Sequence, residues 1–155
     1  MKRQKYQTPP GGFVGVDRLL LESQAYRSLP PTAGKMLPYF LGKMKALLST
    51  AETYYSTSFT FTFAEGRKYG CTKKTFYRVI CALVQFGFID PCVKGGIFQQ
   101  GHVSSLFKLS KRWKRYGTAA FEIISWESFG QDQIKDHGTF RHCIGDKKRT
   151  DGASN

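Results

Sequence analysis

The sequence lacks the closely paired cysteines of metal-binding and redox motifs. None of its four cysteines lies in a CxxC pattern: Cys71, Cys81, Cys92 and Cys143. This spacing matches neither a zinc site nor a thioredoxin-like motif, so we expect reduced thiols. His137, His142 and Cys143 do not complete the four-ligand spacing of a structural zinc site. We therefore predict no metal and no other cofactor.

Long apolar runs are also missing. No stretch approaches the roughly 18 consecutive apolar residues that a membrane-spanning helix needs. The N-terminal residues MKRQKYQTPPGG carry positive charges without the apolar segment that a secretory signal places behind them. We expect a cytoplasmic, nucleoid-associated protein that has no membrane partner.

Catalytic patterns are absent as well. The three histidines, His102, His137 and His142, have no carboxylate or nucleophile beside them in a motif with catalytic meaning. The sequence contains no P-loop, whose backbone amides and lysine cradle phosphates. We predict that the protein is not an enzyme.

Acidic residues are scarce, most of all in the middle of the chain. The 155 residues include 24 Lys and Arg but 11 Asp and Glu, which gives a net charge of +13. Between Gly66 and Phe121 there are eleven basic residues against the one acid Asp90, so this segment carries +10. Such a field attracts a polyanion, because each Lys or Arg at a phosphate releases condensed counterions. The alternative is a helix surface that is basic merely to stay soluble.

A capping box marks the start of a short helix within this basic region. Thr62 followed three residues later by Glu65 is that pattern, and it predicts a helix that continues to Tyr69. Gly66 weakens this helix by about 1 kcal/mol relative to alanine. Gly70 ends the helix, and a second helix follows.

The second helix, Thr72 to Phe86, separates apolar from polar side chains. Thr72 suits the N-cap position, and one stripe of the helix is apolar: Phe76, Val79, Ile80, Leu83 and Val84. The opposite face is polar and largely basic: Lys73, Lys74, Tyr77, Arg78 and Gln85. Two helices joined by a glycine turn are the layout of a helix-turn-helix, in which the first turn of the second helix usually reaches base edges in the major groove.

The N-terminal part is expected to support this motif. A polar arm is expected to give way to ordered chain near Phe13. A brief helix over Val16–Ser23 would pack three leucines inward: Leu19, Leu20 and Leu21. Helical spacing of apolar residues then runs from Pro31 to Leu48, with a bend or break at Pro38. The alternation of phenylalanines in Thr57–Phe63 predicts a half-buried strand.

Downstream of the second helix, the pattern predicts a β-hairpin. One strand ends near Val93, the returning strand is Leu106–Leu109, and the turn is formed by Lys94, Gly95 and Gly96. Pro91 cannot donate to a sheet ladder, so its strand should lie at an edge. Lys94 and the glycine-rich loop through His102 would project from the hairpin, and the loop would lie along phosphates or enter the minor groove. The alternative is an ordinary mobile hairpin tip.

The cluster SKRWKRYG, residues 110–117, has two interpretations. In the first, its rings stack on bases or sugars while Lys111 and Arg112 hold phosphates. In the second, Trp113 packs on the domain and the basic residues around it are solvated.

Apolar residues continue after this cluster and then stop. The segment from Ala119 to Phe129 has enough apolar side chains to dock elsewhere, for instance on a second copy in a homodimer. Residues 130–155 lose that pattern and are expected to form a disordered tail. A replication or transcription partner would bind through residues 118–155.

The order helix, strand, helix, turn, helix, hairpin resembles the winged-helix family of DNA-binding proteins, most closely those of phages, plasmids and other mobile elements. The resemblance covers roughly Leu29 to Ser110, with similar stretches at GGFVGVDRLLLES (11–23), YGCTKKTFYRVICALVQFGFID (69–90) and LSKRWKRYGTAAFE (109–122). It implies that the recognition-helix positions are Thr72, Lys73, Lys74, Tyr77 and Arg78. It also implies a wing at Lys94, Gly95 and Gly96.

We therefore predict an α+β winged helix-turn-helix over residues 13–129, with a three-helix core, a small antiparallel sheet and a hairpin wing. A flexible arm (1–12) precedes it and the tail (130–155) follows. The predicted function is binding of double-stranded DNA by a transcriptional regulator of a mobile element, with helix 72–86 in the major groove and the wing on the backbone. A replication-initiation or replisome-organising role and a protein-interaction module are the alternatives.

Overall fold

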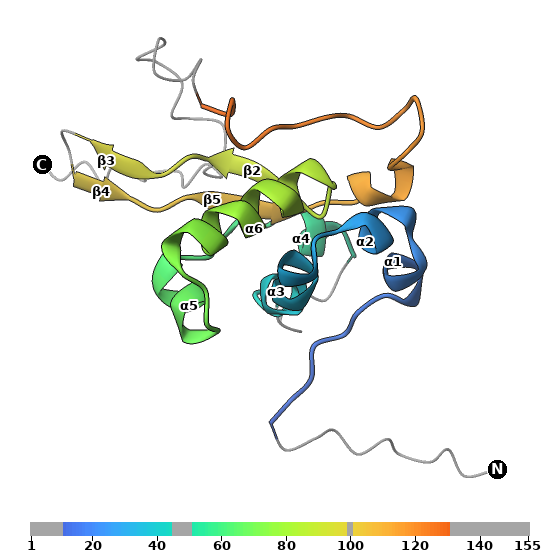
Figure 1. Ribbon diagram of the computed structural model, residues 1–155, viewed down its shortest axis with the longest axis horizontal. Coiled ribbons are helices and arrows are strands. Elements are labelled where there is room, and N and C mark those ends of the chain that lie inside the picture. Colours follow the sequence, from blue (N-terminus) through green and yellow to red (C-terminus); the bar gives the residue numbers. More distant parts are fainter. Residues whose placement is uncertain (1–10, 45–50, 99–100, 131–155) are drawn as a thin grey trace, which may run out of the picture.

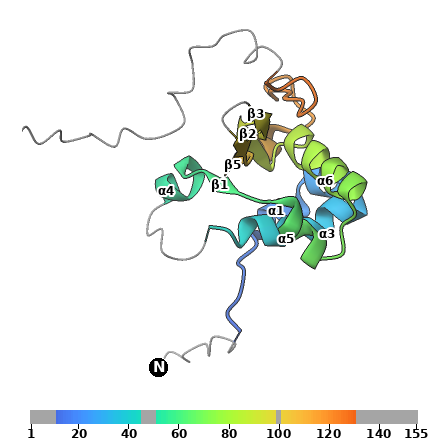
Figure 2. The ribbon, with the colours of Figure 1, turned by 90° about the vertical axis from the view of Figure 1, so that its left-hand side faces the viewer.

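The computed structural model describes residues 11–44, 51–98 and 101–130. These residues combine helices with small antiparallel sheets, which agrees with the α+β class (Figure 1, Figure 2). The helices are α1 (Arg18–Glu22), α2 (Gln24–Ser28), α3 (Pro31–Leu41), α4 (Ala51–Ser56), α5 (Phe63–Lys68), α6 (Lys73–Gln85) and the 3₁₀-helix η1 (Arg112–Arg115). The strands are β1 (Phe59–Thr60), β2 (Ile89–Val93), β3 (Gly96–Phe98), β4 (Gly101–Val103) and β5 (Leu106–Leu109).

The core lies where α3 and α6 pack against each other and against the sheet. The predicted apolar stripe of α6 is confirmed, since all five of its members are buried: Phe76, Val79, Ile80, Leu83 and Val84. Phe40 of α3 stacks on Phe61 with ring centroids 4.0 Å apart and meets Phe107 of β5 edge-on. Helix α6 is therefore held by one face, and its opposite face stays in solvent.

Helix α3 is shorter than its apolar spacing predicts. It ends at Leu41, and the Gly42 amide closes it by donating to the carbonyl of Pro38 over 2.8 Å. The prediction at Pro38 was a bend or a break, and the break is excluded because Pro38 lies inside the helix without ending it. The predicted continuation to Leu48 falls partly on residues 45–48, outside the described residues.

The leucines of α1 do not all point inward. Leu20 is buried, whereas Leu19 is 63% exposed and Leu21 is 43% exposed, so the prediction for these two is wrong. The cause is geometric, because consecutive helical residues are about 100° apart and three in a row cannot share a face. Ser23 ends α1 and caps a second helix, α2, that the sequence pattern did not predict.

The capping box at the start of α5 is confirmed. The Thr62 amide donates to Glu65 Oε2 over 2.8 Å, and the Glu65 amide donates to Thr62 Oγ1 over 3.3 Å. Lys43 also pairs with Glu65. Burial alone would raise the pKa of Glu65, but the hydrogen bonds from Lys43 and Thr62 outweigh it and lower this pKa. Because the pKa is depressed by folding, the contribution of Glu65 to stability is present at neutral pH and lost as acidification passes that pKa.

The main sheet has the strand order β1, β5, β2, and its strands are antiparallel. Strand β2 lies at the edge, as the proline at position 91 predicts, with Ile89 opposite Leu109. Strand β1 is shorter than predicted, because it ends at Thr60 and Phe63 already belongs to α5.

The predicted turn at residues 94–96 is wrong. Gly96 begins β3, which pairs with β4 in a second ladder that places Ile97 opposite His102. The hairpin is therefore longer than the sequence suggests. The connection between β3 and β4 contains residues 99–100, outside the described residues.

Gly66 has a packing role that its helix propensity hides. A Cβ atom at this position would lie 2.4 Å from Cδ2 of the Phe76 ring, so α5 can approach α6 this closely only with glycine. Gly66→Ala should lower the free energy of unfolding by about 1 to 2 kcal/mol, because overpacking outweighs the gain in propensity. Chemical denaturation measures this change.

Gly34→Ala is the matched control for this prediction. A Cβ atom there would have its nearest neighbour, the Tyr26 hydroxyl, at 3.9 Å, an ordinary contact distance. Without a clash, the higher helix propensity of alanine should raise stability by about 0.5 to 1 kcal/mol. Equal changes in the two variants would contradict the packing role of Gly66.

Candidate nucleic-acid interface

The outward face of α6 presents the residues that the sequence assigns to DNA. Thr72 caps the helix, and its Oγ1 accepts from the amide of Thr75 over 3.2 Å. The side chains on this face are exposed: Lys73, Lys74, Tyr77, Arg78 and Gln85. No described acidic residue forms an ion pair with the two lysines or the arginine. These three cations are thus available to a ligand.

Lys94 does not project from the hairpin as predicted. Its ammonium group donates to the backbone carbonyls of Trp126 and Glu127 over 2.9 and 3.1 Å. It also lies 5.2 Å from the centroid of the Trp126 ring. The charge of Lys94 is therefore used to hold residues 126–127 against the base of the hairpin.

The two glycines that follow Lys94 serve the hairpin itself. A Cβ atom on Gly95 would lie 2.3 Å from the carbonyl oxygen of Val103, and the Gly95 amide donates to Ser105 Oγ over 2.9 Å. Gly96 is the first residue of β3. The close approach of two segments of the hairpin therefore explains the glycine at position 95, and no ligand is needed to explain it.

Arg112 is mostly buried. The second interpretation of the SKRWKRYG cluster, in which the basic residues around Trp113 are solvated, is therefore wrong for this residue. Its side chain is 12% exposed, and Nε donates to Asp90 Oδ1 over 2.6 Å. The remaining guanidinium nitrogens donate to three backbone carbonyls: Val84, Ile89 and Glu122. Arg112 thereby joins the end of α6, the start of β2 and the segment after η1.

Other members of the SKRWKRYG cluster divide between core and surface. Trp113 is buried and stacks on Phe88, as the second interpretation predicts. Lys111, Lys114 and Arg115 are exposed. Lys111 lies over the ring of Tyr55, with Nζ 4.3 Å from the centroid. Of the four basic residues in the cluster, Arg112 is therefore bound within the protein and the other three are exposed.

Residues 118–130 form a strap without helix or strand that extends from η1 along β2 toward the hairpin (Figure 1). Trp126 fixes the strap, since it is 5% exposed and its ring centroid lies 5.3 Å from that of Phe107. Burial raises the pKa of the Cys81 thiol on α6, and the charge of Glu127 raises it further. The strap therefore brings a carboxylate close to α6, next to the candidate interface.

Docking of the strap predicts where the chain tolerates truncation. A stop after Gly130 keeps Trp126 and the carbonyls that bind Lys94, so the melting temperature should stay within about 2 °C of the full chain. A stop after Gly117 removes Trp126 and the Glu122 carbonyl, one of the three that Arg112 binds, and it should lower the melting temperature by about 10 °C or more. Calorimetry of the three chains checks this.

The outcome also tests the predicted tail. Residues 131–155 lie outside the described residues, so the tail stays a prediction. Loss of cooperative unfolding on truncation after Gly130 would show that these residues belong to the domain.

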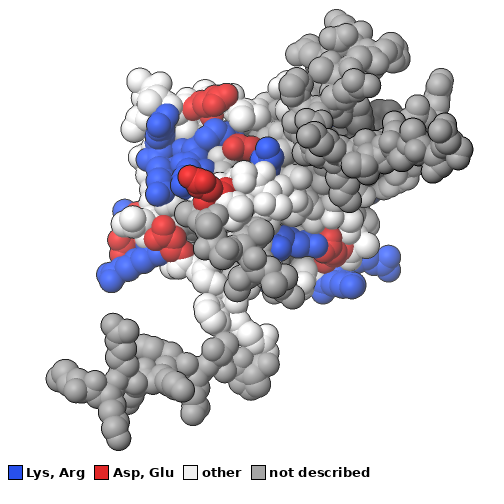
Figure 3. Space-filling model, turned by 180° about the vertical axis from the view of Figure 1, so that it is seen from behind, with Lys and Arg blue, Asp and Glu red and all other residues white. Residues whose placement is uncertain are grey.

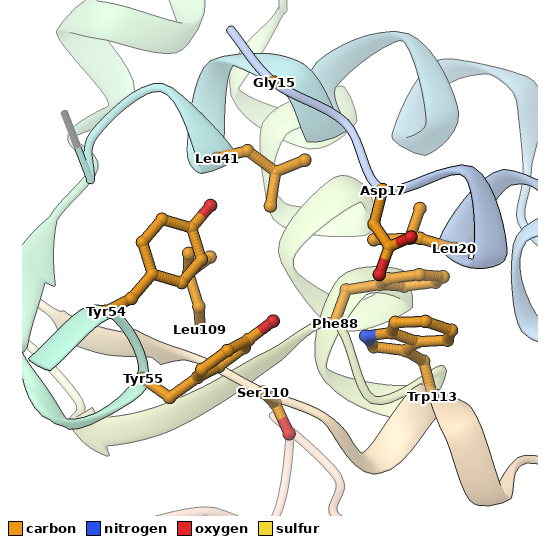
Figure 4. Close-up of a pocket in the computed structure, with 10 residues that line it drawn as sticks. All are labelled: Gly15, Asp17, Leu20, Leu41, Tyr54, Tyr55, Phe88, Leu109, Ser110 and Trp113. Atoms are coloured by element: carbon orange, nitrogen blue, oxygen red, sulfur yellow. The ribbon is translucent and has the colours of Figure 1, made fainter. Parts of the chain in front are cut away.

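A small cavity behind the sheet is too small for a metabolite. It measures about 40 Å³ and is lined by polar groups and rings that include Asp17, Tyr54, Tyr55, Ser110 and Trp113 (Figure 4). A volume of this size suits ordered water bound to polar groups. In the part of the chain that the structure describes, no three His, Cys, Asp or Glu residues form a group that could hold a metal ion.

None of the described helices is long and apolar enough to cross a membrane. Comparisons with protein-family models, with curated proteins and with solved structures found no significant match to this chain. The arrangement of its own residues therefore carries the functional argument.

Proposed function

We propose that the protein binds duplex DNA as a winged-helix domain and regulates transcription on a mobile element. The succession α3, β1, α5, α6, β2, β5, with α4 added before β1 and with β3 and β4 extending the hairpin, and the sheet order β1, β5, β2 support this proposal. In this arrangement α6 is the recognition helix and the hairpin built from β2 to β5 is the wing.

The observation that carries the proposal is the contrast between the two faces of α6. One face is buried along its length, and the other offers Lys73, Lys74 and Arg78 without described acidic partners. Lys73 and Lys74 lie in the first turn, which reaches base edges or the neighbouring phosphates when such a helix enters the major groove. Tyr77 adds a half-exposed ring between them and Arg78.

Within this proposal, the interface differs from the one predicted from the sequence. Thr72, Lys73, Lys74, Tyr77 and Arg78 remain as proposed contacts. Lys94 and Arg112 serve as supports, because their charged groups are bound within the protein. Lys111 remains exposed, at the far end of α6 from Lys73.

The test is a salt titration on duplexes selected from a random pool. We expect the triple variant Lys73→Ala, Lys74→Ala, Arg78→Ala to keep its melting temperature, because none of the three belongs to the apolar stripe. Each lost phosphate contact should flatten the slope of log affinity against log salt by about 0.9, and each lost base contact should cost about 1 to 3 kcal/mol at one position. Fluorescence anisotropy at several salt concentrations measures both.

Lys147→Ala, Lys148→Ala, Arg149→Ala is the control, since it removes the same charge from residues outside the described part of the chain. This control variant should still bind duplexes that carry the selected consensus sequence. If the folded α6 variant binds with unchanged affinity and slope, α6 does not read DNA, and the protein-interaction module becomes the better proposal. A palindromic consensus would support a homodimer.

The replication-initiation or replisome-organising role remains the second candidate. It needs a surface for a partner, and the strap offers Ile123, which is 80% exposed although its neighbour Trp126 is buried. In this second candidate, the partner would contact the strap at this exposed side chain.

A further inference from the structure

A second basic surface lies at the far end of α6 from its first turn. It consists of Lys111, Lys114 and Arg115, and we call it the η1 surface. All three side chains are exposed, and no described acidic residue forms an ion pair with them. Seen from behind, blue side chains gather on the side of the molecule where η1 lies, with acidic side chains at the margin (Figure 3). The surface therefore offers positive charge to a partner.

The backbone that carries the η1 surface is held in place by the core. Between its members, Trp113 is buried, and its amide donates to the carbonyl of Gly87 over 3.1 Å. Lys111 is the N-cap residue of η1 and Lys114 follows three residues later, a spacing that favours side chains on one side of a 3₁₀ turn. Their ammonium groups lie 4.3 Å from the Tyr55 centroid and 5.4 Å from the Trp113 centroid. A fixed backbone reduces the ordering cost of binding.

Distance separates the η1 surface from the proposed DNA interface. Lys73 begins α6, whereas η1 packs at the other end, where Phe86 meets Tyr116 with ring centroids 5.1 Å apart. A helix of 13 residues is about 20 Å long. Strand β5 likewise leads from the hairpin at one end of the molecule to η1 at the other (Figure 1). The first turn of α6 and the η1 surface thus lie at opposite ends of this helix, and a duplex can contact the first turn without contacting the η1 surface.

The chemistry of the η1 surface matches phosphate rather than bases. Trp113 is buried, and Tyr116 is half-buried with its ring packed against Phe86 and Phe121, so neither ring projects into solvent beside the cations. What remains outward is a set of cations. Cations without an available stacking ring bind the nucleic-acid backbone and carry no sequence information.

We propose that the η1 surface binds the phosphate backbone of a second DNA segment, so that one protein molecule links two duplexes. The inference rests on the proposed function, because the first duplex is the one held by α6. The second segment is held without sequence preference, and the interaction weakens with salt.

The test is capture of one duplex by another. A duplex with the selected site is immobilised on beads, protein is added, and a fluorescent duplex without the site follows in about 50 mM salt, where phosphate contacts are strong. The variant is Lys111→Gln, Lys114→Gln, Arg115→Gln, because glutamine keeps part of each aliphatic stem while removing the charge. Lys147→Gln, Lys148→Gln, Arg149→Gln removes the same charge elsewhere. Thermal melts establish that each protein is folded.

The wild type and the charge-matched control should capture the fluorescent duplex. The η1 variant should bind the immobilised duplex within about twofold of the wild type and capture about tenfold less of the second, as expected for the loss of three phosphate contacts. Capture that survives in the η1 variant would overturn the inference and indicate linkage by a dimer. Binding of the first duplex without capture of a second by the wild type would also overturn it and favour an acidic protein partner. Failure to bind the first duplex would instead refute the proposed function.

Discussion

Replacing Leu83 with alanine should lower the free energy of unfolding by about 2 to 5 kcal/mol. Leu83 is 0% exposed and belongs to the apolar stripe of α6, the helix that packs on α3. Removal of its branched end loses buried apolar contact and leaves a cavity that a close-packed core fills only in part. Urea denaturation followed by circular dichroism measures the change.

Leu19→Ala is the matched control, since it makes the same chemical change at a side chain that is 63% exposed. It should change stability by less than about 0.5 kcal/mol. A melt of Leu83→Ala that coincides with the wild type would show that α6 does not pack by this stripe, and the assignment of its outward face would fail with it.

The elements that could be predicted from the sequence are those specified by nearby residues. The capping box of Thr62 and Glu65 needs a separation of three residues, and the stripe of α6 repeats within each turn. The edge position of β2 follows from the missing amide of Pro91. In each case the physical cause acts within a few residues, so one sequence is sufficient to reveal it.

The leucines of α1 were a local error, but the errors that affect the hairpin and the candidate site concern contacts between residues that are far apart in the chain. Gly66 and Gly95 resemble helix-weakening and turn residues, but their close neighbours are Phe76 and the carbonyl of Val103. No local pattern announces such an approach. The turn predicted at residues 94–96 failed for the same reason, because glycine suits a strand that another chain segment approaches closely as well as a turn.

The strap explains why the candidate site was predicted only in part. Residues 118–130 have neither helical nor strand periodicity, yet their backbone carbonyls bind Lys94 and Arg112. Backbone carbonyls are present in every residue, so sequence gives no signal for which of them will accept a hydrogen bond. Consequently a basic residue in a binding role and one in an internal role look alike before the fold is known.

Arg112→Ala should lower the free energy of unfolding by about 3 kcal/mol, because it removes one partner of a largely buried ion pair and the donors to three carbonyls. The Arg112 side chain is 12% exposed, whereas that of its partner Asp90 is 36% exposed. Water can therefore hydrate the freed carboxylate, which keeps the cost at the low end of the range for broken buried pairs. Chemical denaturation of the full chain measures it.

Arg115→Ala provides the comparison, because Arg115 lies one 3₁₀ turn away and is exposed. Its removal should change stability by less than about 0.5 kcal/mol. If the proposed function and the inference about the η1 surface hold, Arg115→Ala should weaken capture of a second duplex without changing the free energy of unfolding. The main effect of Arg112→Ala should instead be a lower free energy of unfolding. If the two variants unfold at the same denaturant concentration, Arg112 does not join α6, β2 and the strap, and it returns to the set of cations available to DNA.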